Sequence, residues 1–219
     1  MLHGTTAHII QSVASTPVGY VDTAGAVGNN TGVTVIAPSY TGANFLLAFF
    51  SFERTGDFPT TPTGLTVLDN AFFNNWGRVY YRVLTGSDPA SYAFSYSTPN
   101  EANGAIVMTF SGVDTSDPFD ADEYASEANE VVTTHSCGSV ETSGSGRMVV
   151  SFIGVNDNVS ATNPTGYTET YDAGNNSASS GIQVASAYDA DVSTGSYSPT
   201  WTTGTSEDSV WFTIALKPS

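Results

Sequence analysis

Hydrophobic and polar positions alternate along much of this chain with the period of two residues that is typical of β-strands. Runs rich in Phe, Tyr, Val and Thr are separated by Gly, Pro, Asn or Asp. In the first half, the pattern predicts strands near residues 33–36, 45–52, 66–69, 79–85, 92–96 and 105–110. The best helical candidate is DADEYASEANE (120–130), where we expect a short helical turn or an acidic loop. The pattern therefore predicts an all-β protein.

The chain also repeats itself at a spacing of about 104 residues. GAIVMTFSGVD (104–114) overlays DSVWFTIALKP (208–218), and Gly42 overlays Gly146, so that NFLLAFFSF falls on MVVSFIGVN. Gly77 overlays Gly181 at the same spacing. PTGLTVLD (62–69) matches PTGYTETYD (164–172) with a slip of two residues, which the preceding loop absorbs. We therefore predict two similar halves, about residues 32–114 and 136–219.

Two Greek-key-like halves, each with one apolar face, would stabilise one another by packing sheet on sheet. We predict a single β-sandwich domain of jelly-roll type over residues 32–219. Residues 1–31 lie outside the repeat and are predicted to form an N-terminal arm, as an extra edge strand or as an extension that reaches a neighbouring subunit. The apolar side chains of this arm, which are the candidate partner-binding residues, are Ile9, Ile10, Val13 and Val18.

Composition narrows the range of partners. The 219 residues include 5 basic and 21 acidic side chains, for a formal net charge of −16. Such a surface repels nucleic acid and anionic membranes, so we expect neither as a partner. The single cysteine, Cys137, excludes an internal disulfide and a cysteine-based zinc site. Neither a signal peptide nor an apolar membrane span stands out, which predicts synthesis and assembly in a cytoplasm.

No catalytic or cofactor signature stands out, and we do not expect an enzyme. His135 lies close to Cys137, but we expect a surface histidine and a half-buried cysteine rather than a nucleophile and its base. No pair of carboxylates is singled out for glycoside hydrolysis. The acidic segment DTSDPFDADEYASE (114–127) could offer oxygen ligands to calcium, but it lacks the EF-hand pattern, and a solvated acidic loop is the simpler interpretation.

Aromatic residues offer a binding hypothesis instead. Trp76 lies in the Asn-rich stretch FFNNWGR, with Tyr80 four residues further on, and we expect Trp76 to be the tryptophan most exposed to solvent. Such rings could stack on sugars, whereas in a β-sandwich most of them are simply core.

Several segments together resemble a β-sandwich domain of tailed-phage virion proteins and some bacterial surface proteins. The matching stretches are PTGLTVL, VYYRVLTGSDPASYAF, TFSGVD, NPTGYTETYD and FTIALKPS, and the resemblance covers about residues 32–219. Leu65 stands where the family often has Trp, so an aromatic platform at that position would be lost.

The resemblance implies a non-enzymatic structural protein of a tailed-phage virion, assembled in the host cytoplasm. It would be a capsid decoration, cement or fibre subunit that stabilises the particle or contacts the host surface. Its partners would be other capsid or tail proteins and further copies of itself in a homo-oligomer. The alternative is a carbohydrate-binding or adhesin module that recognises a cell-surface glycan, with Trp76 and Tyr80 as its platform.

Overall fold

The computed structural model describes residues 15–53, 59–72, 74–97, 101–176 and 181–219, and for residues 121–130 it describes the backbone alone. Within these ranges the chain forms antiparallel β-sheets and no helix, which confirms the predicted all-β sandwich. The helical turn or loop expected at 120–130 is wrong. That segment lies inside the long strand β8 (Phe119–Ser136), because it pairs with the closing strand β15 (Thr200–Leu216).

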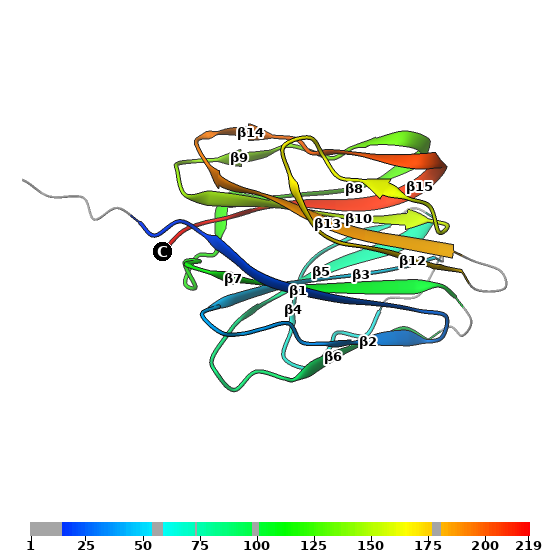
Figure 1. Cartoon of the computed structure of the whole chain (residues 1–219), viewed down its shortest axis with the longest axis horizontal. Helices are drawn as coiled ribbons and strands as arrows, with labels where there is room; N and C mark the ends of the chain where they lie inside the picture. The colour runs from blue at the N-terminus through cyan, green and yellow to red at the C-terminus, as the bar shows by residue number, and fades with distance from the viewer. Residues whose placement is uncertain (1–14, 54–58, 73, 98–100, 177–180) are drawn as a thin grey trace, which may run out of the picture.

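Two large sheets form the centre of the molecule (Figure 1). The first has the order β1-β7-β3-β5-β4. Its strands are β1 (Gly19–Gly28), β3 (Phe45–Glu53), β4 (Thr66–Phe72), β5 (Asn75–Val83) and β7 (Asn103–Ser111). The second has the order β11-β15-β10-β13-β12, and β8 also pairs with β15. Its remaining strands are β10 (Arg147–Asn156), β11 (Ala161–Thr162), β12 (Thr168–Asn176) and β13 (Gly181–Val192).

The order of strands is the same in both halves of the chain. The series β7-β3-β5-β4 in the first sheet corresponds to β15-β10-β13-β12 in the second, with β1 beside β7 and β8 beside β15. Each half also has a small two-stranded sheet. In the first half it consists of β2 (Gly32–Ile36) and β6 (Ser91–Ser95), and in the second of β9 (Val140–Thr142) and β14 (Gly195–Tyr197).

These sheets stack in four layers, with a small sheet outside each large one (Figure 1). The inward side chains of β3, such as Phe45 and Phe49, belong to the core between the large sheets. The alternate side chains, such as Leu46 and Phe50, belong to a second core beneath β2 and β6. Both faces of β3 are therefore buried, which explains why its sequence is continuously apolar. The jelly-roll type of the sandwich stays a prediction.

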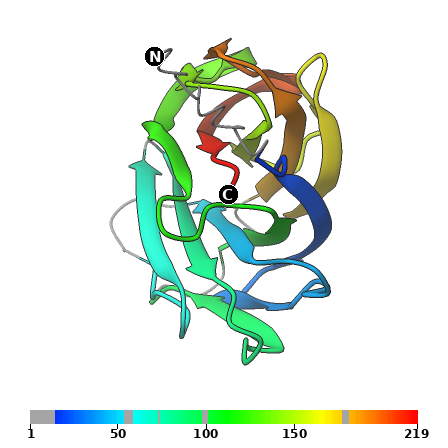
Figure 2. The ribbon, with the colours of Figure 1, turned by 90° about the vertical axis from the view of Figure 1, so that its left-hand side faces the viewer.

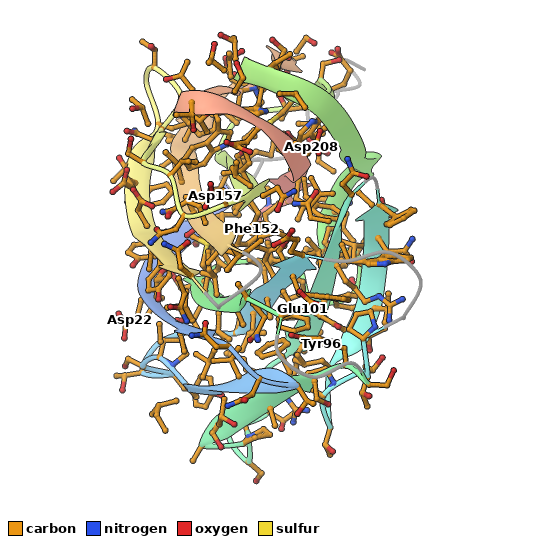
Figure 3. The ribbon with its side chains drawn as sticks, turned by 90° about the vertical axis from the view of Figure 1, so that its right-hand side faces the viewer. Asp22, Tyr96, Glu101, Phe152, Asp157 and Asp208 are labelled. Atoms are coloured by element: carbon orange, nitrogen blue, oxygen red, sulfur yellow. The ribbon has the colours of Figure 1, made fainter. Side chains whose placement is uncertain are left out.

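Aromatic stacking joins the two large sheets. Phe49 stacks on Phe152 with ring centroids 5.4 Å apart and meets Phe212 edge-on at 5.8 Å. Phe152 lies between the sheets, near the middle of the molecule (Figure 3). The absence of a side chain at Gly104 allows the sheets to approach, because a β-carbon there would lie 2.6 Å from Val184 Cγ2.

The edges of the large sheets also meet. Strand β1 of the first sheet lies beside β12 of the second, and β8 of the second lies beside β4 of the first (Figure 2). Gly25 in β1 faces the ring of Tyr171, where a β-carbon would lie 2.3 Å from Cζ. Each half therefore covers one edge of the other.

This arrangement decides between the two alternatives predicted for the N-terminal segment. Residues 19–28 form the extra edge strand, because they pair with β7 at the edge of the first sheet, and they are not an extension that reaches a neighbouring subunit. Val18 is buried in the central core, and its N–H donates to the Gly146 carbonyl at 2.9 Å, so it is not free to bind a partner. Ile9, Ile10 and Val13 lie outside the described residues. The sandwich therefore begins near Val18 rather than at residue 32.

The Pro-Thr-Gly turns of the two halves have the same local structure. Gly64 and Gly166 have φ of +82° and +88°, the left-handed conformation that favours glycine. The following residues close equivalent turns, since Leu65 N–H donates to Pro62 O at 3.1 Å and Tyr167 N–H donates to Pro164 O at 3.0 Å. Each turn leads to a strand with a register irregularity, in β4 after Val67 and in β12 after Glu169.

We expect Phe49→Ala to lower the free energy of unfolding by about 3–5 kcal/mol, because it removes a fully buried ring from the contact between the large sheets. Chemical denaturation at neutral pH measures this change. The matched control is Ile36→Ala on a strand of the outer sheet, where the side chain is 71% exposed and the change should stay within about 0.5 kcal/mol. Equal effects of the two substitutions would contradict the proposed importance of the central contact.

Candidate functional site

The predicted aromatic platform is wrong. Trp76 is only 6% exposed and Tyr80 is fully buried. Both belong to the core between β5 and the first outer sheet, and the Trp76 ring stacks on Phe72 at 4.6 Å. Burial raises the pKa of Tyr80 to about 12. The reason is the outer sheet, which covers a face of β5 that would be open to solvent in a two-layer sandwich.

His135 and Cys137 are also more buried than predicted, at 0% and 2% exposure. The His135 ring lies between two hydroxyl groups, with Nδ1 2.8 Å from Ser209 Oγ and Nε2 3.1 Å from Thr203 Oγ1. Thr203 Oγ1 donates its proton to the Thr205 carbonyl at 2.7 Å, so it accepts one from His135 Nε2. Nδ1 then accepts from Ser209. Burial lowers the pKa of His135, and this neutral histidine links β8 to β15.

Cys137 has the surroundings of a structural cysteine rather than of a nucleophile. It belongs to an apolar core cluster with Trp201, Trp211 and Ile153. Burial raises the pKa of its thiol well above the usual value, which keeps it protonated near neutral pH. The described residues next to it therefore do not form a Cys/His pair for covalent catalysis.

The acidic segment predicted as a calcium candidate is partly used in protein contacts. The Asp120 carboxylate accepts from Arg147 Nε at 2.6 Å and from Ser143 N–H at 2.6 Å. Asp117 pairs with Lys217 at 2.5 Å, and Asp114 accepts from the Ser116 hydroxyl at 2.7 Å. Among the described side chains, no group of three or more His, Cys, Asp or Glu residues could hold a metal ion.

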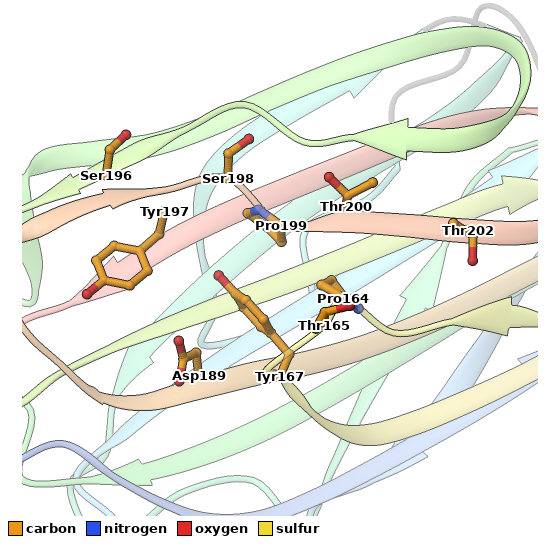
Figure 4. Close-up of a pocket in the computed structure, with 10 residues that line it drawn as sticks. All are labelled: Pro164, Thr165, Tyr167, Asp189, Ser196, Tyr197, Ser198, Pro199, Thr200 and Thr202. Atoms are coloured by element: carbon orange, nitrogen blue, oxygen red, sulfur yellow. The ribbon is translucent and has the colours of Figure 1, made fainter.

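The second half carries a surface groove, which we call the Tyr167 groove (Figure 4). It lies between the Pro-Thr-Gly turn before β12 and the segment that runs from β14 into β15, and it has a volume of about 460 Å³. Its apolar lining comes from the rings of Tyr167, Tyr197, Pro164 and Pro199. Its polar lining consists of hydroxyl groups and one carboxylate, from Thr165, Ser196, Ser198, Thr200, Thr202 and Asp189.

Two side chains give the Tyr167 groove its chemical character. The hydroxyl of Tyr167 is buried and has no hydrogen-bond partner among the described residues. Burial raises the pKa of Tyr167, and the negative charge of Asp189 raises it further. Burial likewise raises the pKa of the Asp189 carboxyl group, which remains partly exposed on β13. Tyr197 is held in place by a 2.9 Å hydrogen bond from its hydroxyl to the Ser193 carbonyl.

The first half has a smaller groove at the corresponding place, with a volume of about 350 Å³. It is lined by the matching turn residues Pro62 and Thr63 and by Tyr92 of β6. Tyr92 is only 1% exposed, and its hydroxyl is hydrogen-bonded at 3.0 Å to that of Tyr40, which itself donates to the Pro89 carbonyl. Among the described residues, neither a carboxylate nor an aromatic turn residue lines this groove.

No family model, curated protein or solved structure matches this chain. Within the described ranges there is also no helix long and apolar enough to cross a membrane. The functional argument therefore rests on the residues of this chain. The sequence contained one signal for the groove that our sequence analysis did not use, because the second Pro-Thr-Gly turn is followed by Tyr167 where the first is followed by Leu65.

The buried His135 predicts a specific pH dependence of stability. Its pKa in the folded protein lies below the ordinary value of 6.5, so the unfolded chain binds a proton more readily. The stability that His135 contributes is present above pH 6.5 and decreases as the pH falls below it. The Asp172 carboxyl group, whose pKa is raised to about 6 by burial and by Glu169, acts in the opposite direction.

The variant His135→Gln isolates the histidine contribution, since it shares Asp172 with the parent protein. We expect the difference in unfolding free energy between the two proteins to shrink from pH 7.5 to pH 5, measured by urea denaturation. A difference that stays constant over this range would contradict the neutral, buried state of His135.

Proposed function

We propose that this protein is a non-enzymatic structural subunit of a tailed-phage virion, a capsid decoration, cement or fibre protein that stabilises the particle or contacts the host surface. The observation that supports the proposal is the place where the described chain enters the sandwich. Residues 16–18 and the C-terminal Ser219 lie at the same end of the sandwich, where Ser219 N–H donates to Gly112 O at 2.9 Å and Pro17 O lies beside Gly112. A body attached at that end would project its opposite end outward (Figure 1).

The packing of the described residues agrees with a passive, mechanical role. The most reactive side-chain types, His135 and Cys137, are buried and used in structural contacts. The two halves are joined by a continuous core and by strands at both edges. The resemblance in the Pro-Thr-Gly turns and in the FSGVD and IALKP strand ends supports the same class of protein.

Attachment to other capsid or tail subunits is assigned to the segment before the sandwich. Because Val18 and β1 belong to the fold, the partner-binding arm is restricted to residues 1–14, which include Ile9, Ile10 and Val13. Assembly into a homo-oligomer on the particle is part of the proposal, since most assemblies of identical subunits are closed and symmetric.

The direct test is quantitative mass spectrometry of purified particles from the source of this gene. We expect the chain in a fixed ratio to the major capsid or tail protein after the particles have been washed in high salt. Its absence from particles would overturn the proposal. A ratio near that of tail-tip proteins would place it at a fibre, and a ratio near that of the capsid protein would place it on the shell.

Deletion of residues 2–14 should prevent incorporation into particles and leave the melting temperature unchanged, because the sandwich begins after this segment. Deletion of residues 2–30 should instead lower the melting temperature, since it removes β1 from its pairing with β7 and uncovers Tyr171. The measurements are calorimetry and an incorporation assay. Normal incorporation of the shorter deletion would contradict the role of the arm.

A further inference from the structure

We propose that the Tyr167 groove binds an uncharged pyranose unit of a polysaccharide. This inference does not depend on where the protein resides. Trp76 and Tyr80, the residues predicted to bind a sugar, are buried, and the Tyr167 groove is a different site that is open to solvent. The argument rests on the lining of the groove, on its charge and on the contrast between the two halves of the chain.

The lining combines flat apolar surfaces with hydroxyl groups. The half-buried rings of Tyr167 and Tyr197 offer surface on which the C–H groups of a sugar ring can pack, and Pro164 and Pro199 are buried residues of the same lining. The hydroxyls of Ser196, Thr200 and Thr202 belong to exposed residues and can both donate and accept hydrogen bonds. The volume of about 460 Å³ lies within the range of about 300–1,000 Å³ that small-molecule sites occupy. A pyranose ring, with C–H faces and a rim of hydroxyls, matches both features.

The charge of the groove selects against anionic ligands. Among the described residues that line it, Asp189 is the only charged one, and the whole chain has a formal charge of −16. A carboxylate accepts hydrogen bonds from neighbouring sugar hydroxyls, whereas it repels a uronate, sulfate or phosphate group. The site therefore favours neutral sugars over acidic ones.

The first half has the same strand pairing and the same turn, but the described lining of its groove lacks the tyrosine and the carboxylate of the Tyr167 groove. Strand β3 pairs with β5 as β10 pairs with β13, yet among the described residues no carboxylate lines the first groove as Asp189 lines the second. Leu65 follows the turn of the first half at the position equivalent to Tyr167 in the second half, and Leu65 is buried. Leu65 belongs to the outer core and does not line the first groove, whereas Tyr167 lines the second. Packing alone accounts for Leu65 but does not require a tyrosine and an aspartate in the lining of the second groove.

The Tyr167 side chain presents its ring, rather than its hydroxyl, to the groove. The hydroxyl is buried and has no partner among the described residues, so it is out of direct reach of a ligand. The ring forms part of the groove lining, close to Asp189, whose negative charge helps to raise the pKa of Tyr167 (Figure 4). A sugar bound in the groove would therefore pack on the ring of Tyr167 and form its hydrogen bonds with Asp189 and the exposed hydroxyls.

The test is saturation-transfer NMR and titration of the full-length protein with the methyl glycosides of glucose, galactose, mannose and N-acetylglucosamine. Methyl glucuronide serves as the anionic comparison. We expect at least one neutral glycoside to bind with a dissociation constant on the order of 1 mM, and the glucuronide to bind at least about tenfold more weakly. A failure of all neutral glycosides to bind, or a preference for the glucuronide, would overturn the proposal.

Substitutions then locate the site. Tyr167→Leu introduces the residue of the first half, and we expect an affinity loss of about fivefold or more. Asp189→Asn should cost about tenfold, because it removes a charged acceptor. The matched control is Thr63→Ala in the first groove, which should leave the affinity unchanged. Thermal unfolding checks that each variant is folded. If Tyr167→Leu is unstable, Tyr167→Phe takes its place. This variant keeps the ring and should retain most of the binding. Neutral-sugar binding that survives both Tyr167→Leu and Asp189→Asn would overturn the assignment to this groove.

Discussion

The contact between the two large sheets is the interaction on which the rest of this molecule depends. Phe49, Phe152 and Phe212 meet there, and Gly104 leaves room for Val184 so that the sheets can approach closely. Each half contributes one sheet, so neither half buries its inner apolar face without the other. Strands at both edges add to this contact, because β1 lies beside β12 and β8 beside β4. The two halves are therefore joined along one face and two edges.

The two small outer sheets have a different consequence, because they turn surfaces into cores. A strand with one solvated face alternates apolar and polar residues, whereas β3 and β5 are covered on both faces. This is why Trp76 and Tyr80 are buried rather than exposed. In the second half, His135 and Cys137 are buried as well, and neither forms part of a described reactive group. The outer sheet of the first half covers Trp76 and Tyr80. The outer sheets also form one wall of each groove.

The two halves show how one backbone arrangement can carry different side-chain chemistry. The Pro-Thr-Gly turns share their hydrogen bond and their left-handed glycine, which are backbone requirements. The residue after the turn has no such requirement, and it is Leu65 in one half and Tyr167 in the other. The side chain at this position therefore differs between the halves while the hydrogen bond and the glycine of the turn stay the same.

The sequence by itself determined the all-β class and the glycine turns, because strand periodicity and turn residues are local properties. It did not determine which residues face which core. Overlaying the halves at a constant spacing of 104 places Phe49 on Ile153, yet Phe49 faces the central core and Ile153 the outer one. Side chains alternate along a strand, so a shift of one residue exchanges the two faces. Likewise, only tertiary pairing with β15 made a strand of residues 120–130, and only the outer layers decided that Trp76 is buried while the Tyr167 groove is open to solvent.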